Sequence, residues 1–203
     1  MIRVKICGIT RPEDGLAAAE AGAWAIGLVF ARESPRFVNA KQALAITDAL
    51  PKTVLRVGVF QNQSLDVISR VEREVPLDLI QLHGHEKDEQ CLAVGRARCI
   101  KAVVLLDAPS VDRVARFSSD FLLVDRPRGS AHPTAPWKLA AQLAAKREKT
   151  LLAGGLTPEN VAEAIREVKP WGVDVASGVE RSPGVKDPRL IRAFVEAAIR
   201  GQT

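Results

Sequence analysis

The chain has 203 residues, of which 47% are hydrophobic and 26% charged, a normal balance for a globular protein that can bury a sizeable core. No apolar run approaches the ~18 residues of a membrane span, and Arg3 and Lys5 stand where a signal peptide would need apolar residues. We therefore expect a cytoplasmic protein of one domain over residues 1–203, without a membrane partner.

Charge and cysteine usage narrow the function classes further. Cys7, Cys91 and Cys99 are an odd number at wide spacing, which favours neither a disulfide framework nor a metal site. The net charge of +5 is spread along the chain and stacking aromatics are few, so a small anionic substrate fits at least as well as nucleic acid. A binder of nucleic acid or phosphate remains the non-catalytic alternative.

The first predicted unit carries a thiol at a strand end. Apolar and polar residues alternate over residues 2–7, and Gly8 ends the strand. Thr10 and Glu13 have the spacing of a capping box, which predicts a helix over residues 14–20. Cys7 thus lies at the carboxyl end of a strand. The alternative is that its thiol is a small buried hydrophobe.

The same alternation of strand and helix continues to the end of the chain. Strands are predicted at residues 24–30, 54–60, 77–83, 99–105, 121–124, 150–153 and 173–176. Helices are predicted at residues 41–50, 67–75, 86–94, 110–116, 137–146, 158–168 and 188–199, with Thr157 and Pro158 starting the seventh and Asp187 and Pro188 the last.

Eight strand-helix units with short connections predict an α/β protein, a (β/α)8 TIM barrel. A doubly wound open sheet is the alternative, but no G-x-G-x-x-G follows the first strand. A barrel this short could pair with a copy of itself as a homodimer, although no stretch identifies the surface.

Barrel geometry gathers four chemical groups at one mouth. If Ile2, Val4 and Ile6 face the helices, alternation turns Lys5 and Cys7 inward. By the same rule Gln81, His83 and Asp125 point inward on their own strands. Arg36 stands on a loop above them. Cys7 and Asp125 are candidates for a proton-transfer pair of the kind that aldose-ketose isomerisation requires.

Lys5, two residues before Cys7, has two interpretations. It could favour the thiolate of Cys7. The favoured interpretation is a structural one, a buried ion pair with Asp174 on the neighbouring eighth strand, since a buried charge needs a partner.

Glycine-bearing corners at the ends of the last two strands suit a phosphorylated small molecule. Gly154 and Gly155 follow the seventh strand, and Ser177 and Gly178 follow the eighth, each pair close to the start of a helix. Loops at these places of a barrel commonly hold phosphate through backbone amides. Plain turn glycines are the alternative.

The chain resembles the phosphoribosylanthranilate isomerases of tryptophan biosynthesis in motifs spread from end to end. These are Lys5-Ile-Cys-Gly-Ile-Thr10, Ser34-Pro-Arg36, Gly58-Val-Phe60, Gln81-Leu-His-Gly84, Asp125 at its strand end, Leu152-Ala-Gly-Gly-Leu156, Pro158-Glu-Asn-Val161, Gly172-Val-Asp-Val-Ala-Ser-Gly-Val-Glu180 and Gly184-Val-Lys-Asp187.

The resemblance implies an Amadori rearrangement of N-(5′-phosphoribosyl)anthranilate without metal or cofactor. It makes Asp125 the general acid, Cys7 the general base and Arg36 the contact of the anthranilate, with the Gly154-Gly155 and Ser177-Gly178 loops on the phosphate. His83 is also assigned to substrate binding.

The segment after Asp125 departs from this pattern. Relatives commonly show Gly-Gly-Thr-Gly and then Phe-Asp-Trp, where this chain has Arg128-Gly-Ser-Ala-His132 and Ala135-Pro-Trp137. This departure weakens the case for a phosphate contact from this loop. Two other enzyme classes stay open: an isomerase of an imidazole-carboxamide aminosugar, and an enzyme with a thiol nucleophile.

Overall fold

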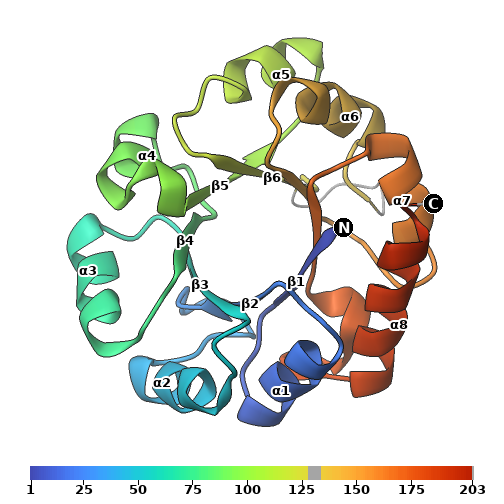
Figure 1. Cartoon of the computed structure of the whole chain (residues 1–203). Coiled ribbons are helices and arrows are strands. Elements are labelled where there is room, and N and C mark those ends of the chain that lie inside the picture. The colour runs from blue at the N-terminus through green and yellow to red at the C-terminus, as the bar shows by residue number, and fades with distance from the viewer. Residues whose placement is uncertain (128–133, 203) are drawn as a thin grey trace.

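Eight parallel strands close into a barrel in the computed structural model, which describes residues 1–127 and 134–202. The strands pair in sequence order, and β1 pairs with β8 to close the ring (Figure 1). Their bounds are β1 Arg3–Cys7, β2 Ala25–Val29, β3 Leu55–Phe60, β4 Leu79–Leu82, β5 Cys99–Val104, β6 Phe121–Asp125, β7 Thr150–Leu152 and β8 Gly172–Val175. The predicted TIM barrel is confirmed.

Helices form an outer ring around the strands (Figure 1). Their bounds are α1 Pro12–Glu20, α2 Ala40–Ala49, α3 Leu65–Glu74, α4 Asp88–Val94, α5 Ala108–Val114, α6 Trp137–Lys146, α7 Val161–Val168 and α8 Pro188–Arg200. Two short 3-10 helices, η1 Arg96–Arg98 and η2 Ser177–Val179, follow α4 and β8. As predicted, Asp187 caps α8, its side chain accepting from the backbone N–H of Arg189 at 2.8 Å.

Alternation along the strands separates the apolar residues that pack against the helices from those inside the barrel. Ile2, Val4 and Ile6 of the first strand lie in the large cluster that also holds buried residues of the helices. Between them, Lys5 and Cys7 face the barrel interior, where Lys5 is completely buried. The predicted facing of this strand is confirmed.

The buried pair of Lys5 and Asp174 joins the first and last strands. The two residues are register partners, and Lys5 Nζ donates to Asp174 Oδ1 at 2.8 Å. Burial alone would lower the pKa of Lys5, but the Asp174 carboxylate outweighs it and the pKa is raised. The favoured interpretation of Lys5 is thus confirmed.

Two predicted helix starts are wrong. Thr10 does not cap α1, because its hydroxyl donates to the carbonyl of Gly184 at 2.5 Å, far along the chain, and Arg11 occupies the cap position. Helix α7 begins at Val161, and Thr157 and Pro158 belong to the turn before it. A tertiary contact in the first case and a longer turn in the second override the local signal.

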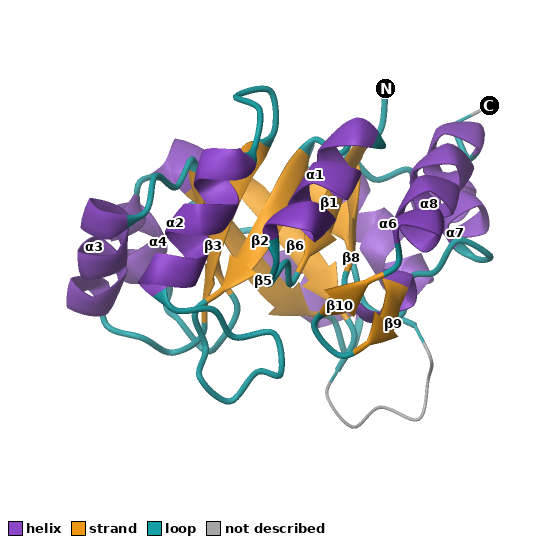
Figure 2. Cartoon of the chain, turned by 90° about the horizontal axis from the view of Figure 1, so that it is seen from below, coloured by secondary structure: helices purple, strands orange, loops and turns teal. Residues whose placement is uncertain are grey.

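A short antiparallel hairpin in the loop after β8 was not predicted. It consists of β9 Glu180–Ser182 and β10 Val185–Lys186. It lies at the end of the barrel opposite the two chain termini (Figure 2). In the described part of the chain, no helix has the length and apolar character needed to span a membrane.

We predict that Asp174→Asn destabilises the fold, because it leaves the Lys5 ammonium buried without its counter-ion. Breaking a buried pair typically costs about 3–5 kcal/mol, and the free energy of unfolding in urea should fall by about this much. The control is Asp120→Asn, whose partly exposed partner Lys149 lies 3.6 Å away. It should cost less than about 1 kcal/mol. Equal small losses would contradict the role of Asp174.

Candidate functional site

Cys7 ends β1 at the barrel mouth, where glycines shape its surroundings. Its register partner on β2 is Gly27, and a Cβ added there would lie 2.7 Å from the Cys7 sulfur. Gly8 follows with φ +75, a conformation that favours glycine, and both Gly8 and Ile9 donate their N–H to the Gly27 carbonyl at 2.9 Å. Cys7 as a whole residue is 8% exposed and is therefore buried at this end of the barrel.

The electrostatics of Cys7 combine burial with nearby cations. Burial raises the pKa of the thiol, and the ammonium groups of Lys5 and Lys186 lower it, with burial prevailing. In the free protein the resting form is therefore a thiol. The negative charge of Asp174 also raises the pKa of the thiol, so either further positive charge nearby or neutralisation of Asp174 would favour the thiolate.

Asp125, at the end of β6, is held by two donors. His83 Nε2 lies 3.0 Å from Asp125 Oδ2, and the N–H of Arg126 donates to Oδ1 at 2.7 Å. The amide nitrogen of Gln81 lies 2.7 Å from His83 Nδ1. When that amide donates, the ring proton sits on Nε2 and points to Asp125. Sequence alternation predicted these inward positions.

Those donors set the ionisation of Asp125. Burial raises its pKa, but the hydrogen bond with His83 and the one from the backbone N–H of Arg126 outweigh burial, so the pKa is lowered. The resting form is a carboxylate. Asp125 and His83 line a cavity of about 630 Å³ that also borders Lys101 and Phe117.

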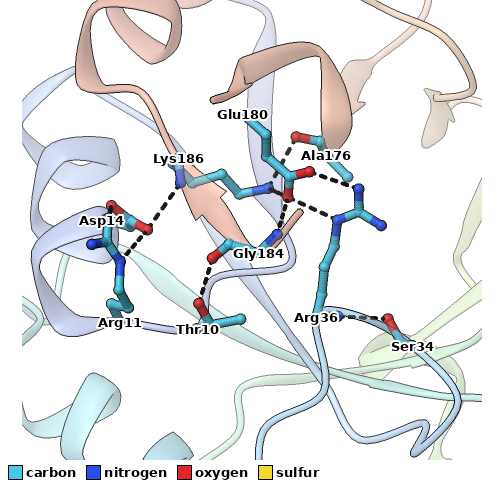
Figure 3. Close-up of polar contacts among 9 residues, drawn as sticks. All are labelled: Thr10, Arg11, Asp14, Ser34, Arg36, Ala176, Glu180, Gly184 and Lys186. Atoms are coloured by element: carbon cyan, nitrogen blue, oxygen red, sulfur yellow. Dashed lines mark hydrogen bonds and ion pairs between the residues drawn. The ribbon is translucent and has the colours of Figure 1, made fainter. Parts of the chain in front are cut away.

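Arg36 reaches toward the same mouth from the loop after β2, but its guanidinium already has a partner. Its Nε and Nη2 donate to the two carboxylate oxygens of Glu180 at 2.8 and 2.7 Å (Figure 3). A Cβ at Gly8 would lie 2.3 Å from the Cδ of Arg36, so the glycine lets this side chain lie against the turn that follows Cys7.

The two glycine-bearing corners contact their neighbours closely. Gly154 has φ +80, and a Cβ there would lie 2.8 Å from Asp125 Oδ1, which places this corner beside the carboxylate. Gly155, with φ +75, accepts a hydrogen bond at its carbonyl from the Asn160 side chain at 2.9 Å. A Cβ at Gly178 would lie 2.0 Å from the Leu156 carbonyl oxygen, so the corners after β7 and β8 touch.

The structure corrects one detail of these corners. The sequence places Ser177 and Gly178 near the start of the last helix, but they form the 3-10 helix η2, and the β9–β10 hairpin separates them from α8. Any amide that faces an anion here belongs to η2 or its turn.

Strand order arranges the predicted residues around one opening. The order β6, β7, β8, β1, β2 puts Asp125, the two glycine corners, Cys7 and the Arg36 loop on consecutive positions of the ring. Residues 128–132 of the divergent loop lie outside the described part. Among the described residues, no three His, Cys, Asp or Glu side chains gather as a metal site would.

Comparison with known proteins gives a consistent result. The family model described as N-(5′-phosphoribosyl)anthranilate isomerase matches residues 4–197. This chain belongs to that family. It is accordingly an isomerase.

Named relatives cover nearly the whole chain. The N-(5′-phosphoribosyl)anthranilate isomerase of Pelobacter propionicus is 46% identical over 202 residues, which are 98% of this chain and 96% of the relative. The crystal structure of monomers of the dimeric phosphoribosylanthranilate isomerase of Thermotoga maritima has a TM-score of 0.89 at 39% identity, covering 98% of this chain and 99% of that one.

A second solved structure includes a ligand. It is a phosphoribosylanthranilate isomerase in complex with reduced 1-(o-carboxyphenylamino)-1-deoxyribulose 5-phosphate, with a TM-score of 0.89 and 39% identity over 98% of this chain and 99% of that one.

Sequence reasoning assigned no role to Glu180, Lys186, Gly27 or, beyond its inward direction, Gln81. Glu180 and Lys186 stand within motifs shared with the isomerase family, but a motif match does not reveal which partner a side chain takes. The available signal in the sequence was that Glu180 and Lys186 are charged residues close to glycines in one short stretch.

We predict that His83→Leu raises the pKa of Asp125, because it removes a donor to the carboxylate and leaves burial in place. Carboxyl ¹³C NMR titration measures the shift. His85→Leu is the matched control, since His85 is exposed and lines the same cavity. A lower or unchanged pKa in the His83 variant would contradict the assigned interaction.

Proposed function

We propose that this chain catalyses the Amadori rearrangement of N-(5′-phosphoribosyl)anthranilate to 1-(2-carboxyphenylamino)-1-deoxyribulose 5-phosphate in tryptophan biosynthesis. The observation that carries the proposal is the order around the barrel mouth: a carboxylate on β6, glycine corners after β7 and β8, and a thiol on β1. Membership of the isomerase family supports the same reaction.

Asp125 is the general acid of this proposal. Protonated, it gives its proton to the furanose ring oxygen of the substrate, and the ring opens to a Schiff base. His83 Nε2 lies 3.0 Å from Asp125 Oδ2, and this contact orientates the carboxyl group. The short distance from a Cβ built at Gly154 to Asp125 Oδ1, 2.8 Å, supports a phosphate-binding corner next to the proposed acid.

Cys7 is the general base. As a thiolate it removes the proton from C2 of the Schiff base to give an enolamine, which tautomerises to the ketone. Lys5 and Lys186 both lower the pKa of this thiol, and so favour the form that accepts the proton.

The resting ionisation of both groups is the reverse of the reactive one. With the pKa of Asp125 lowered and that of Cys7 raised, the free protein holds a carboxylate and a thiol. The reactive form, a carboxylic acid and a thiolate, holds the same number of protons. One proton therefore has to be redistributed within the site, without net uptake from solvent.

The two anionic ends of the substrate match two parts of the mouth. Arg36 holds the anthranilate carboxylate, and the Gly154-Gly155 and Ser177-Gly178 corners hold the phosphate through backbone amides. The ligand described in the related complex has both a carboxyphenyl group and a phosphate. The dimeric relative from Thermotoga maritima supports pairing of this chain as a homodimer.

The direct test follows the loss of N-(5′-phosphoribosyl)anthranilate with purified protein. Cys7→Ser and Asp125→Asn should each lower kcat by roughly 10²–10⁴-fold with little change in KM, because each removes a proton transfer and spares binding. Cys91→Ala, on α4, and the surface variant Asp120→Asn are the controls. Near-normal turnover of both site variants would refute the mechanism.

A second prediction concerns the phosphate corners. Gly178→Ala places a Cβ 2.0 Å from the Leu156 carbonyl oxygen, so the corners after β7 and β8 have to separate. We expect KM to rise by about tenfold or more, because small displacements of a binding group are costly. Gly15→Ala, inside α1, should leave KM unchanged. Inhibition by inorganic phosphate should weaken only in the Gly178 variant.

A further inference from the structure

The loop after β8 contains a buried charge cluster whose carboxylate, Glu180, has no role in the proposed chemistry. Lys186 is completely buried, and its Nζ donates to Glu180 Oε1 at 2.8 Å and to the Ala176 carbonyl at 2.9 Å. The N–H of Gly184 reaches the same carboxylate oxygen at 3.3 Å. The Glu180 side chain is 5% exposed, so the protein fixes this carboxylate from several directions.

The hairpin that carries the cluster is itself attached to the start of the barrel. The backbone N–H of Lys186 donates to Asp14 of α1 at 3.1 Å, and Thr10 donates to the carbonyl of Gly184 (Figure 3). Asp14 in turn accepts from Arg11. Glu180 is thus held relative to the turn that follows Cys7.

Glu180 binds only one edge of the Arg36 guanidinium. It accepts from Nε and Nη2, the side-on edge. A guanidinium has five N–H donors, and the end-on fork of Nη1 and Nη2 remains available for a second carboxylate. In Figure 3 the third nitrogen of Arg36 points away from Glu180, and it makes no hydrogen bond to the residues that the structure describes.

The net charge around Arg36 is positive even when Glu180 is ionised, which favours the binding of an anion. Arg36 and Lys186 bring two positive charges against the single negative charge of Glu180, whose pKa is lowered despite burial by its bonds to these two residues. The carboxylate of Glu180 therefore orientates Arg36 without cancelling the local positive charge.

We propose that Glu180, fixed by Lys186, is a positioning residue that holds Arg36 side-on, so that its end-on fork receives the carboxylate of the substrate's aromatic amine. The inference rests on the proposed function and adds to it the residue that selects an amine with an ortho carboxylate. Replacing Glu180 then weakens carboxylate binding, although simple charge removal would strengthen it. The direction of the change in KM therefore distinguishes two roles of Glu180: one that positions Arg36 for the substrate, and one that competes with the substrate carboxylate for Arg36.

The experiment compares two substrates formed from ribose 5-phosphate, one with anthranilate and one with aniline, which lacks the carboxylate. For Glu180→Gln we expect KM of the anthranilate adduct to rise by about tenfold and KM of the aniline adduct to stay unchanged, because only the first uses the fork. Arg181→Gln is the matched control, an exposed residue of the same strand. A fall in KM for the anthranilate adduct would overturn the proposal.

Further variants separate positioning from loss of structure. Glu180→Asp keeps the charge beside Lys186 but shortens the side chain, and it should also raise KM for the anthranilate adduct alone. In an Arg36→Ala background Glu180→Gln should add no further increase. Equal losses on both substrates, or full additivity, would overturn the role. If the wild-type protein turns over neither adduct, the proposed function itself fails.

Discussion

The ion pair of Lys5 and Asp174 is the interaction on which the site depends. It joins the first strand to the last across the seam that closes the barrel, and it does so with a completely buried ammonium. Cys7 follows Lys5 on the same inward face, and a Cβ at Gly27 would lie 3.2 Å from Lys5 Nζ and 2.7 Å from the Cys7 sulfur. A buried ammonium is costly without a counter-ion, so Lys5 is paired with Asp174 where the barrel closes. The same ammonium is a cation close to the Cys7 thiol.

The pKa of Cys7 is raised and that of Asp125 is lowered, and the surroundings of each group explain the difference. The thiol of Cys7 is enclosed by small apolar residues, and burial outweighs the nearby cations. Asp125 is partly exposed and has donors on both oxygens, so hydrogen bonding outweighs burial. In the proposed reaction the two groups act in the other forms. The rate then depends on the pair of ionisations together, and the two apparent pKa values of a pH profile belong to the pair.

The sequence was sufficient for features that repeat along the chain and insufficient for features that join distant segments. Segments of strand length between predicted helices predicted all eight strands. The alternation of side chains along a strand predicted the inward direction of Cys7, His83 and Asp125, since side-chain direction in a strand is local. The contact of Thr10 with Gly184 and that of Arg36 with Glu180 span 174 and 144 residues, and no local signal encodes them. The start of α7 was predicted too early for a different reason. Thr157 and Pro158 are residue types that start helices, but they are equally common in turns, and here they belong to the turn before α7.

The loop after β8 connects both ends of the proposed substrate site. It begins with Ser177 and Gly178, which contact the corner after β7, and it continues into the hairpin whose Glu180 holds Arg36. A displacement of this loop therefore moves a proposed phosphate contact and the proposed carboxylate contact together. The buried side chain of Lys186 fixes the hairpin between them. In the proposed function, this segment therefore helps to set the distance between the phosphate and carboxylate sites, and with it the length of the substrate that fits.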